Sequence, residues 1–166
     1  MRPIFSFMMT LGCSNYTIIE FFPLNHLPLT GIYKLNVDAS VYKGGLQVGA
    51  GSVMQNSDGK LVLAAATVFR SGFVVDVAET LAILDGWRLA TARGLIPLLV
   101  ESDALSVVNL CLDISSSKLE IMNVIHDIYL LWSNFPSCYI VLVPRSCNSA
   151  AYEVVKFALL ASISVV

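Results

Sequence analysis

Residues 33–40 have the sequence Tyr-Lys-Leu-Asn-Val-Asp-Ala-Ser, in which apolar and polar side chains alternate with a period of two. This period is typical of a β-strand with one buried face. Asp38 lies on the polar phase of the strand with Lys34 and Asn36, so taken alone it is explained as a residue that faces water. The stretch thus predicts the first strand of the domain and supplies one candidate acid.

The flanking sequence predicts an α/β domain with the element order βββαβααβα. Residues 48–55 and 60–69 are expected to be two more strands joined by the Asn-Ser-Asp-Gly turn at 56–59, which makes an antiparallel meander. Apolar residues recur at helical spacing over 76–92, and Gly94 follows as a stop signal. The remaining expected elements are a buried strand at 96–101, helices at 104–112 and 119–132, a strand at 139–143 and a last helix at 149–163.

Composition limits the kind of protein to which this domain can belong. The chain has 166 residues, of which 56% are hydrophobic and 13% charged, enough for one domain with a real core. Residues 1–31 lack clear periodicity and are expected to be an irregular N-terminal extension before a domain at 32–166. Apolar runs are too short for a membrane span, and the first residues make a poor signal peptide. We therefore expect an intracellular protein, cytoplasmic or nuclear, that is not secreted and has no membrane partner.

Charge and cysteine spacing narrow the possible partners. The four cysteines form no C-x-x-C pair, which indicates reduced and mostly buried thiols. The formal net charge is -2 and no run of Lys or Arg occurs, so bulk electrostatic attraction cannot hold nucleic acid. The glycines at 44–45 and 49–51 lead into a strand rather than a helix, which excludes a dinucleotide fingerprint. No small-molecule cofactor is expected, and a nucleic-acid partner must be held locally or through metal ions.

Two further acids, Glu79 and Asp103, also have ordinary local explanations. Glu79 follows Asp76 by three residues at a helix start, which is the spacing of a capping box. Asp103 directly precedes a helix and could be its N-cap, a role worth about 1 kcal/mol. The three acids nevertheless lie, in chain order, on a strand, on a helix and at the end of a strand. This arrangement could bring Asp38, Glu79 and Asp103 to one edge of the sheet. Carboxylates at such short separations raise one another's pKa unless a cation neutralises them. We therefore regard all three as candidate catalytic residues and as ligands of Mg²⁺, with Mn²⁺ as an alternative ion.

Five motifs in this order resemble the ribonuclease H type-1 domain of plant reverse-transcriptase-like proteins. They are residues 33–40, Gly49-Ala50-Gly51, Ala78-Glu79, Glu101-Ser102-Asp103 and the Val-Pro-Arg-Ser-Cys-Asn stretch at 143–148. The resemblance covers about residues 32–159. It implies a ribonuclease H-like fold, with a five-stranded mixed sheet in the order 3-2-1-4-5 and helices on both faces. It also implies hydrolysis of the RNA strand of RNA–DNA hybrids with two Mg²⁺ ions.

The resemblance matches Asp38, Glu79 and Asp103 to the first three metal-binding acids of the family, but Tyr152 stands where the fourth is expected. A phenol is neutral near pH 7 and is a poor Mg²⁺ ligand. Glu153 is adjacent, but one residue along a helix turns a side chain by about 100°. The histidine that the family has before its last helix is also unmatched. Two functions therefore stay open: a hybrid-cleaving nuclease, and a catalytically degenerate domain retained for nucleic-acid or protein binding.

Four side chains are candidates for contacting the substrate, which we expect to be an RNA–DNA hybrid or RNA. Asn36, Ser40, Lys43 and Arg145 could meet phosphates or 2′-hydroxyl groups. As alternatives, Lys43 is a solvated loop charge, and Arg145 with Asn148 organises the start of the last helix, Asn148 being its N-cap. The sequence does not indicate an oligomeric state.

Overall fold

The computed structural model describes residues 8–9, 18–19, 27–42, 47–69, 74–112, 119–161, 164 and 166. The predicted order of strands and helices from residue 33 onward is confirmed, with boundaries shifted by up to two residues. The elements are β1 (Met8–Met9), β2 (Ile18–Ile19), β3 (Tyr33–Tyr42), β4 (Gln47–Gln55), β5 (Leu61–Phe69), α1 (Val75–Ala92), β6 (Leu98–Ser102), α2 (Leu105–Leu112), α3 (Leu119–Asn134), β7 (Tyr139–Leu142), η2 (Arg145–Cys147) and α4 (Ser149–Ala161).

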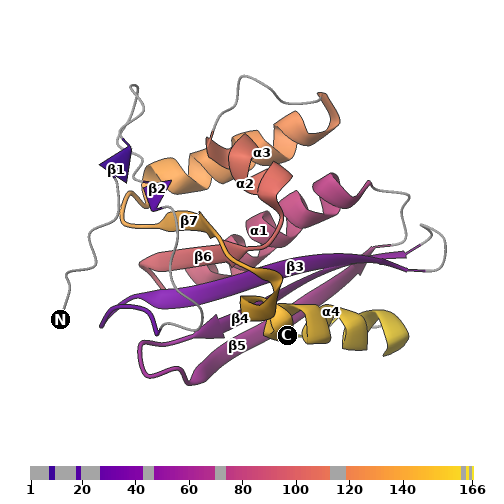
Figure 1. Ribbon diagram of the computed structural model, residues 1–166, viewed down its shortest axis with the longest axis horizontal. Helices are drawn as coiled ribbons and strands as arrows, with labels where there is room; N and C mark the ends of the chain where they lie inside the picture. The colour runs from indigo at the N-terminus through magenta and orange to yellow at the C-terminus, as the bar shows by residue number, and fades with distance from the viewer. Residues whose placement is uncertain are drawn as a thin grey trace.

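A five-stranded sheet in the order β5-β4-β3-β6-β7 forms the centre of the domain (Figure 1). Strand β3 pairs antiparallel with β4 and parallel with β6, and β7 is parallel to β6. If the strands are numbered from the start of the domain, so that β3 is strand 1, this is the predicted mixed sheet in the order 3-2-1-4-5. The predicted turn between β4 and β5 is also present, with Gly59 at a φ of 74°, a conformation that glycine adopts without strain.

Helices cover both faces of the sheet, as predicted. Helix α1 lies against one face so closely that a Cβ on Gly86 would come within 3.1 Å of Ser52 and 3.2 Å of Val37. Helix α4 lies against the opposite face, where a Cβ on Gly51 would collide with Val155. Figure 1 shows α3 stacked outside α1, and α4 alone on the other side. The sheet therefore has no face that is wholly open to water.

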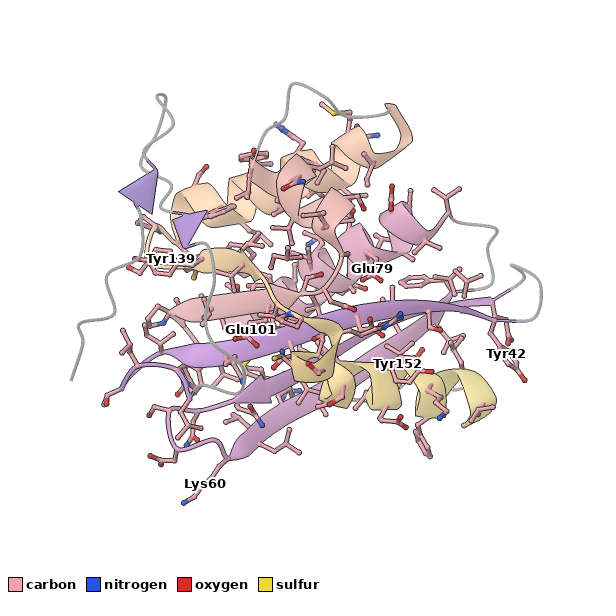
Figure 2. All side chains as sticks on the ribbon, in the orientation of Figure 1. Tyr42, Lys60, Glu79, Glu101, Tyr139 and Tyr152 are labelled. Atoms are coloured by element: carbon pink, nitrogen blue, oxygen red, sulfur yellow. The ribbon has the colours of Figure 1, made fainter. Side chains whose placement is uncertain are left out.

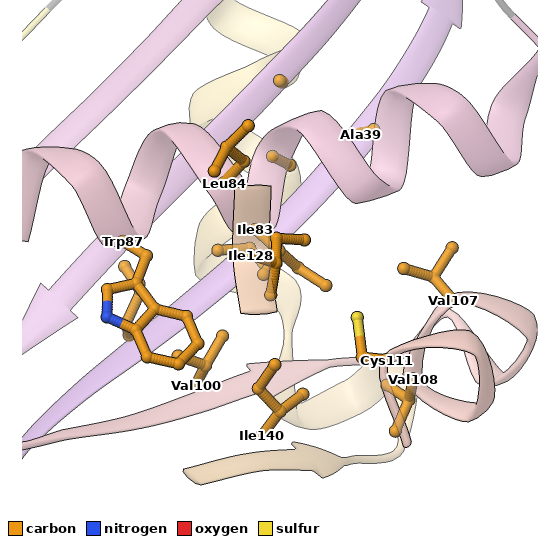
Figure 3. Close-up of a cluster of buried hydrophobic side chains, with 14 of the residues drawn as sticks. Ala39, Ile83, Leu84, Trp87, Val100, Val107, Val108, Cys111, Ile128 and Ile140 are labelled. Carbon is orange, nitrogen blue, oxygen red and sulfur yellow. The ribbon is translucent and has the colours of Figure 1, made fainter. Parts of the chain in front are cut away.

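The main hydrophobic core lies between the sheet and helices α1, α2 and α3 (Figure 3). Trp87 and Trp132 are 0% and 2% exposed, and their ring centroids lie 5.8 Å apart. The indole N–H of Trp132 donates to the carbonyl of Cys138 over 2.9 Å. Cys111 and Cys138 are buried free thiols, as predicted, and Cys147 is half-buried.

The segment expected to be an irregular extension contains one short pairing. Met8–Met9 pairs antiparallel with Ile18–Ile19. The rest of residues 1–26 lies outside the described residues, so the boundary near residue 32 stays a prediction. Among the helices that the structure describes, none is both long enough and apolar enough to span a membrane.

Candidate active site

The site lies where strands β3 and β6 stop pairing. Their parallel register runs from Tyr33↔Leu98 to Asn36↔Glu101. If the register continued by two residues, Asp38 would lie opposite Asp103, which follows the end of β6. Strand β3 is also where the sheet changes from antiparallel to parallel pairing, and ligands of α/β proteins often bind where neighbouring strands part.

Asp38 and Glu79 are both buried, which contradicts the local explanation of each. Asp38 is 2% exposed and does not face water. Glu79 is 7% exposed, and the N-cap of α1 is Val74, without any side-chain cap, so no capping box forms. Asp38 Oδ2 and Glu79 Oε2 are buried and have no hydrogen-bond partner. These two oxygens are the ones that a bound cation or a proton would have to neutralise.

The electrostatics of these carboxyl groups indicate that they lie in one environment. Burial, then the charges of Asp38 and Asp103, raise the pKa of Glu79 from 4.5 to about 8. Burial and the charge of Asp103 raise the pKa of Asp38 from 3.8 to about 6. The backbone N–H of Ala39 lowers the pKa of both groups, so both carboxylates lie near the same amide. Two or more acids that push up one another's pKa are typical of a functional site.

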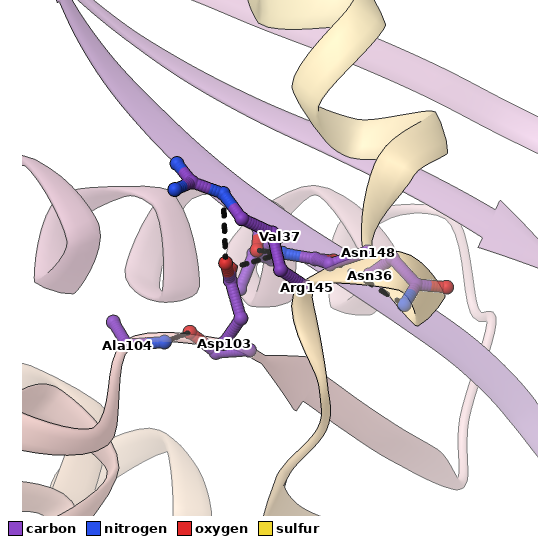
Figure 4. Close-up of polar contacts among 7 residues, drawn as sticks. Asn36, Val37, Asp103, Ala104, Arg145 and Asn148 are labelled. Carbon is purple, nitrogen blue, oxygen red and sulfur yellow. Dashed lines mark hydrogen bonds and ion pairs between the residues drawn. The ribbon is translucent and has the colours of Figure 1, made fainter. Parts of the chain in front are cut away.

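Asp103 has partners of its own (Figure 4). The Asn148 amide donates to Asp103 Oδ1 over 2.7 Å, and Nε of Arg145 lies 3.6 Å from Asp103 Oδ2. The alternative role of Asp103 as the N-cap of α2 is not seen. The Ala104 N–H instead donates to the Ser102 hydroxyl over 3.2 Å.

Asn148 is the site residue whose role sequence reasoning missed. Its side chain is 1% exposed and donates to the Val37 carbonyl over 2.7 Å as well as to Asp103. Its Oδ1 accepts a hydrogen bond from the Asn36 amide over 3.3 Å. Asn148 precedes α4, as the N-cap prediction requires, but its side chain bridges β3 and Asp103. It therefore links the start of α4 to β3 and to the residue that follows β6.

A buried polar network extends from the site along β3. The Asn36 amide donates to Glu101 Oε2 over 2.8 Å, and Lys34 Nζ lies 3.8 Å from the same oxygen. All three side chains are buried. Burial raises the pKa of Glu101, whereas Lys34 and Asn36 lower it. Neither Lys34 nor Glu101 was a predicted site residue, although both lie in motifs that carry the family resemblance.

The predicted substrate contacts lie in different environments. Asn36 is 3% exposed and is committed to the buried network, so it organises the site from inside. Ser40 is half-buried on β3, and Arg145 is exposed. Lys43 lies outside the described residues. The assignment of these residues to substrate binding stays a prediction.

Comparison with protein families identifies the domain. A family model described as reverse transcriptase-like matches residues 36–158. The chain belongs to the reverse transcriptase-like family. The matched range contains Asp38, Glu79, Asp103, Asn148 and Tyr152. No curated protein matches this reverse transcriptase-like chain.

Solved structures show that this reverse transcriptase-like domain has a ribonuclease H-like fold. RNase H1 from the halophilic archaeon Halobacterium salinarum superimposes with a TM-score of 0.70 at 17% identity, covering 78% of this chain and 98% of that one. LC11-RNase H1 in complex with an RNA/DNA hybrid gives 0.70 at 16% identity, with 78% and 98% covered. The foamy viral protease-reverse transcriptase in complex with dsDNA gives 0.59 at 14% identity, with 75% and 90% covered.

Tyr152 marks the clearest departure of this domain from the expected four acids. Figure 2 shows Tyr152 on α4 and Glu79 on α1, two helices on opposite sides of the sheet. Tyr152 is 38% exposed, and Lys156 Nζ lies 5.8 Å from the centre of its ring. The neighbouring acid, Glu153, pairs with Lys156 over 3.8 Å. The position thus holds a phenol and an ammonium group.

The donor set suits one divalent ion better than two. Asp38 and Glu79 each offer a buried oxygen without a partner, which is what an oxygen-seeking cation requires. The oxygens of Asp103 already contact Asn148 and Arg145, and Tyr152 offers no carboxylate. Accordingly, no group of three or more His, Cys, Asp or Glu side chains among the described residues is arranged to hold a metal ion. Asp38 and Glu79 thus offer two unpartnered oxygens to one ion, whereas Asp103 and Tyr152 leave a second position poorly provided with ligands.

Proposed function

We propose that this reverse transcriptase-like domain binds nucleic acid and hydrolyses the RNA strand of RNA–DNA hybrids with a divalent metal ion, Mg²⁺ or Mn²⁺. The observation that carries the proposal is the pair of buried, unpartnered oxygens on Asp38 and Glu79. An uncompensated buried charge costs several kcal/mol, on the order of 3 to 5, and a bound cation would remove that cost. The ribonuclease H-like fold, which one relative uses in a complex with an RNA/DNA hybrid, supports the choice of substrate.

Each residue of the site would have a distinct role in the reaction. Asp38 and Glu79 would hold the ion, which when bound can activate a water molecule and neutralise charge on the phosphate. Asn148 holds Asp103 at the open end of β3, where Asp103 can accept a proton or orient a water molecule. Arg145 is exposed beside Asp103 and can contact a substrate phosphate. Ser40 is half-buried on the same strand as Asp38 and can contact a 2′-hydroxyl group.

A second candidate function is binding of nucleic acid without turnover, and Tyr152 favours it. An exposed aromatic ring can stack on a nucleobase, which is worth about 1–3 kcal/mol per base. Lys156, next to the ring, and Arg145 can contact the phosphates. Such binding would need no metal ion.

A cleavage assay on an RNA–DNA hybrid, run over a range of Mg²⁺ and Mn²⁺ concentrations, separates these functions. Cleavage that Asp38→Asn abolishes and Asp127→Asn leaves unchanged would support the nuclease, because Asp127 lies in a surface ion pair with Arg88. Fluorescence anisotropy of labelled hybrid in EDTA measures binding alone. Binding without cleavage at any metal concentration would support the second function and refute the first, and absence of both would refute both.

The missing fourth acid gives a further test of the nuclease. If a weak second metal position limits the rate, Tyr152→Asp should increase cleavage, whereas Tyr152→Phe should not. An unchanged rate in Tyr152→Asp would show that the fourth position is not limiting.

Two finer assignments are also part of the proposal. The similarity of the motifs to plant, retroelement-derived proteins supports an origin of that kind. The reduced cysteines among the described residues support an intracellular protein, cytoplasmic or nuclear.

A further inference from the structure

We propose that the guanidinium group of Arg145 is a built-in counter-cation of the acid site, so that a divalent ion must compete with it for the site. This inference rests on the proposed function only in taking Asp38 and Glu79 as the place where the ion binds. It concerns the affinity for the ion and does not require that the domain cleave anything.

The position of Arg145 allows this role. Arg145 begins η2, and its side chain lies over Asp103 in Figure 4, with Nε 3.6 Å from Asp103 Oδ2. The Arg145 side chain is 81% exposed and the Asp103 side chain 14%. An exposed, solvated cation therefore lies beside a mostly buried anion, and it can move away without opening the core.

Arg145 is the cation that the fold places at the acid site. Among the residues that the structure describes, it is the only cation that forms an ion pair with one of the three acids Asp38, Glu79 and Asp103. Lys34 is engaged by Glu101, and Lys156 by Glu153 and the Tyr152 ring. Arg145 thus partly offsets the three acids, and its positive charge would repel a divalent ion that arrives between two of them.

The size of the effect follows from the exposure of the guanidinium. Exposed unit charges alter one another's equilibria by a factor of about 1.4 to 5. Because a divalent ion carries twice the charge, the interaction energy doubles and the factor is squared. Removal of the Arg145 charge should therefore strengthen binding of the ion by about 2- to 25-fold. Release of Asp103 from its ion pair would act in the same direction.

As a counter-cation Arg145 weakens binding of the metal ion, whereas as a substrate contact it strengthens binding of the hybrid. Loss of the charge should strengthen binding of the metal ion and weaken binding of the hybrid, because Arg145 can pair with a phosphate. A substrate phosphate that draws Arg145 away from Asp103 would at the same time favour the ion. A purely structural role of Arg145 would weaken both.

Calorimetric titration of the full chain with Mn²⁺, in the absence of nucleic acid, tests this inference. Arg145→Gln should lower the Kd for Mn²⁺ by about 2- to 25-fold. Arg145→Lys, which keeps the charge, should change it less. Asp38→Asn should abolish binding and so locate the ion. Arg88→Gln is the matched control, since it removes an exposed arginine from a surface pair with Asp127 and should leave the Kd unchanged. Circular dichroism of each variant checks the fold.

The outcomes separate this inference from the proposed function. Equal or weaker Mn²⁺ binding by folded Arg145→Gln, an equal gain in Arg88→Gln, or no binding by any variant would overturn the counter-cation role. Cleavage of the hybrid could still stand in the first two cases. A lower Kd in Arg145→Gln supports the inference even if neither protein cleaves the hybrid.

Discussion

Replacing Glu79 by glutamine should stabilise the domain in the absence of metal ions, and the gain should increase as the pH rises. Glutamine has nearly the shape of glutamic acid and cannot ionise. The pKa of Glu79 is about 8 in the folded protein, against an ordinary value of 4.5. Between these two values the unfolded chain releases a proton that the folded chain keeps, so a rising pH favours unfolding of the wild type.

The magnitude follows from the same two pKa values. Below pH 4.5 both states are protonated and the substitution should change the free energy of unfolding little. Above about pH 8 the wild type carries the full cost, at most about 5 kcal/mol at 1.36 kcal/mol per pKa unit. Asp38 titrates in the same environment and shares part of this cost, so we expect a gain of about 2 kcal/mol at pH 8.5.

Urea denaturation in EDTA at pH 4.5, 6, 7.5 and 8.5, followed by circular dichroism, measures this gain. Glu153→Gln is the matched control, because its side chain is 65% exposed and the substitution should have little effect at any pH. A gain in Glu79→Gln that does not depend on pH, or a loss of stability at pH 8.5, would refute the reasoning. Addition of Mg²⁺ should stabilise the wild type more than Glu79→Gln, because only the wild type keeps both ligands.

Three further predictions concern the scaffold. Asn148→Ala should lower the free energy of unfolding by about 2–4 kcal/mol in urea denaturation, because it leaves buried partners without their hydrogen bonds; a loss under about 0.5 kcal/mol would contradict the bridging role. Gly51→Ala should cost about 1–3 kcal/mol through collision with Val155, and adding Val155→Ala should restore part of the loss, as a thermal melt of the double variant would show. Burial raises the pKa of Cys111 to about 12, so iodoacetamide at pH 8 should label the half-buried Cys147 before Cys111, as peptide mass spectrometry can verify.

The alternation in β3 predicted the strand but not the environment of its polar side chains. Lys34, Asn36 and Asp38 do share one phase, as expected. A polar phase usually faces water, but here all three side chains are buried. Helix α4 packs over Gly51, the partner of Asp38 on β4, and Asn36 contacts Cys147 and Asn148 just before α4. Glu101, on the neighbouring strand, satisfies Lys34 and Asn36. Alternation indicates which side chains share a face of the sheet. Whether that face is exposed to solvent depends on the segments that pack against it.

The same limit applies to the acids, whose local explanations failed for a common reason. A capping box at Glu79 and an N-cap at Asp103 depend only on residues nearby in sequence. The side chains instead respond to partners brought by pairing of β3 with β6 and by the start of α4. The order of the acids along the chain indicated only that the fold could bring them to one edge of the sheet.

What the order of the acids could not predict is the condition in which they meet. Asp38 and Glu79 retain unpartnered oxygens, whereas Asp103 is held by Asn148 and paired with Arg145. This asymmetry arises because β3 continues beyond the end of β6 and leaves the Val37 carbonyl for the Asn148 amide, which then lies beside Asp103. A cation that enters the site can therefore bind Asp38 and Glu79 directly, whereas Asp103 must first leave its contacts with Asn148 and Arg145. The loss of the fourth acid at Tyr152 and the hold on Asp103 weaken the same, second metal position.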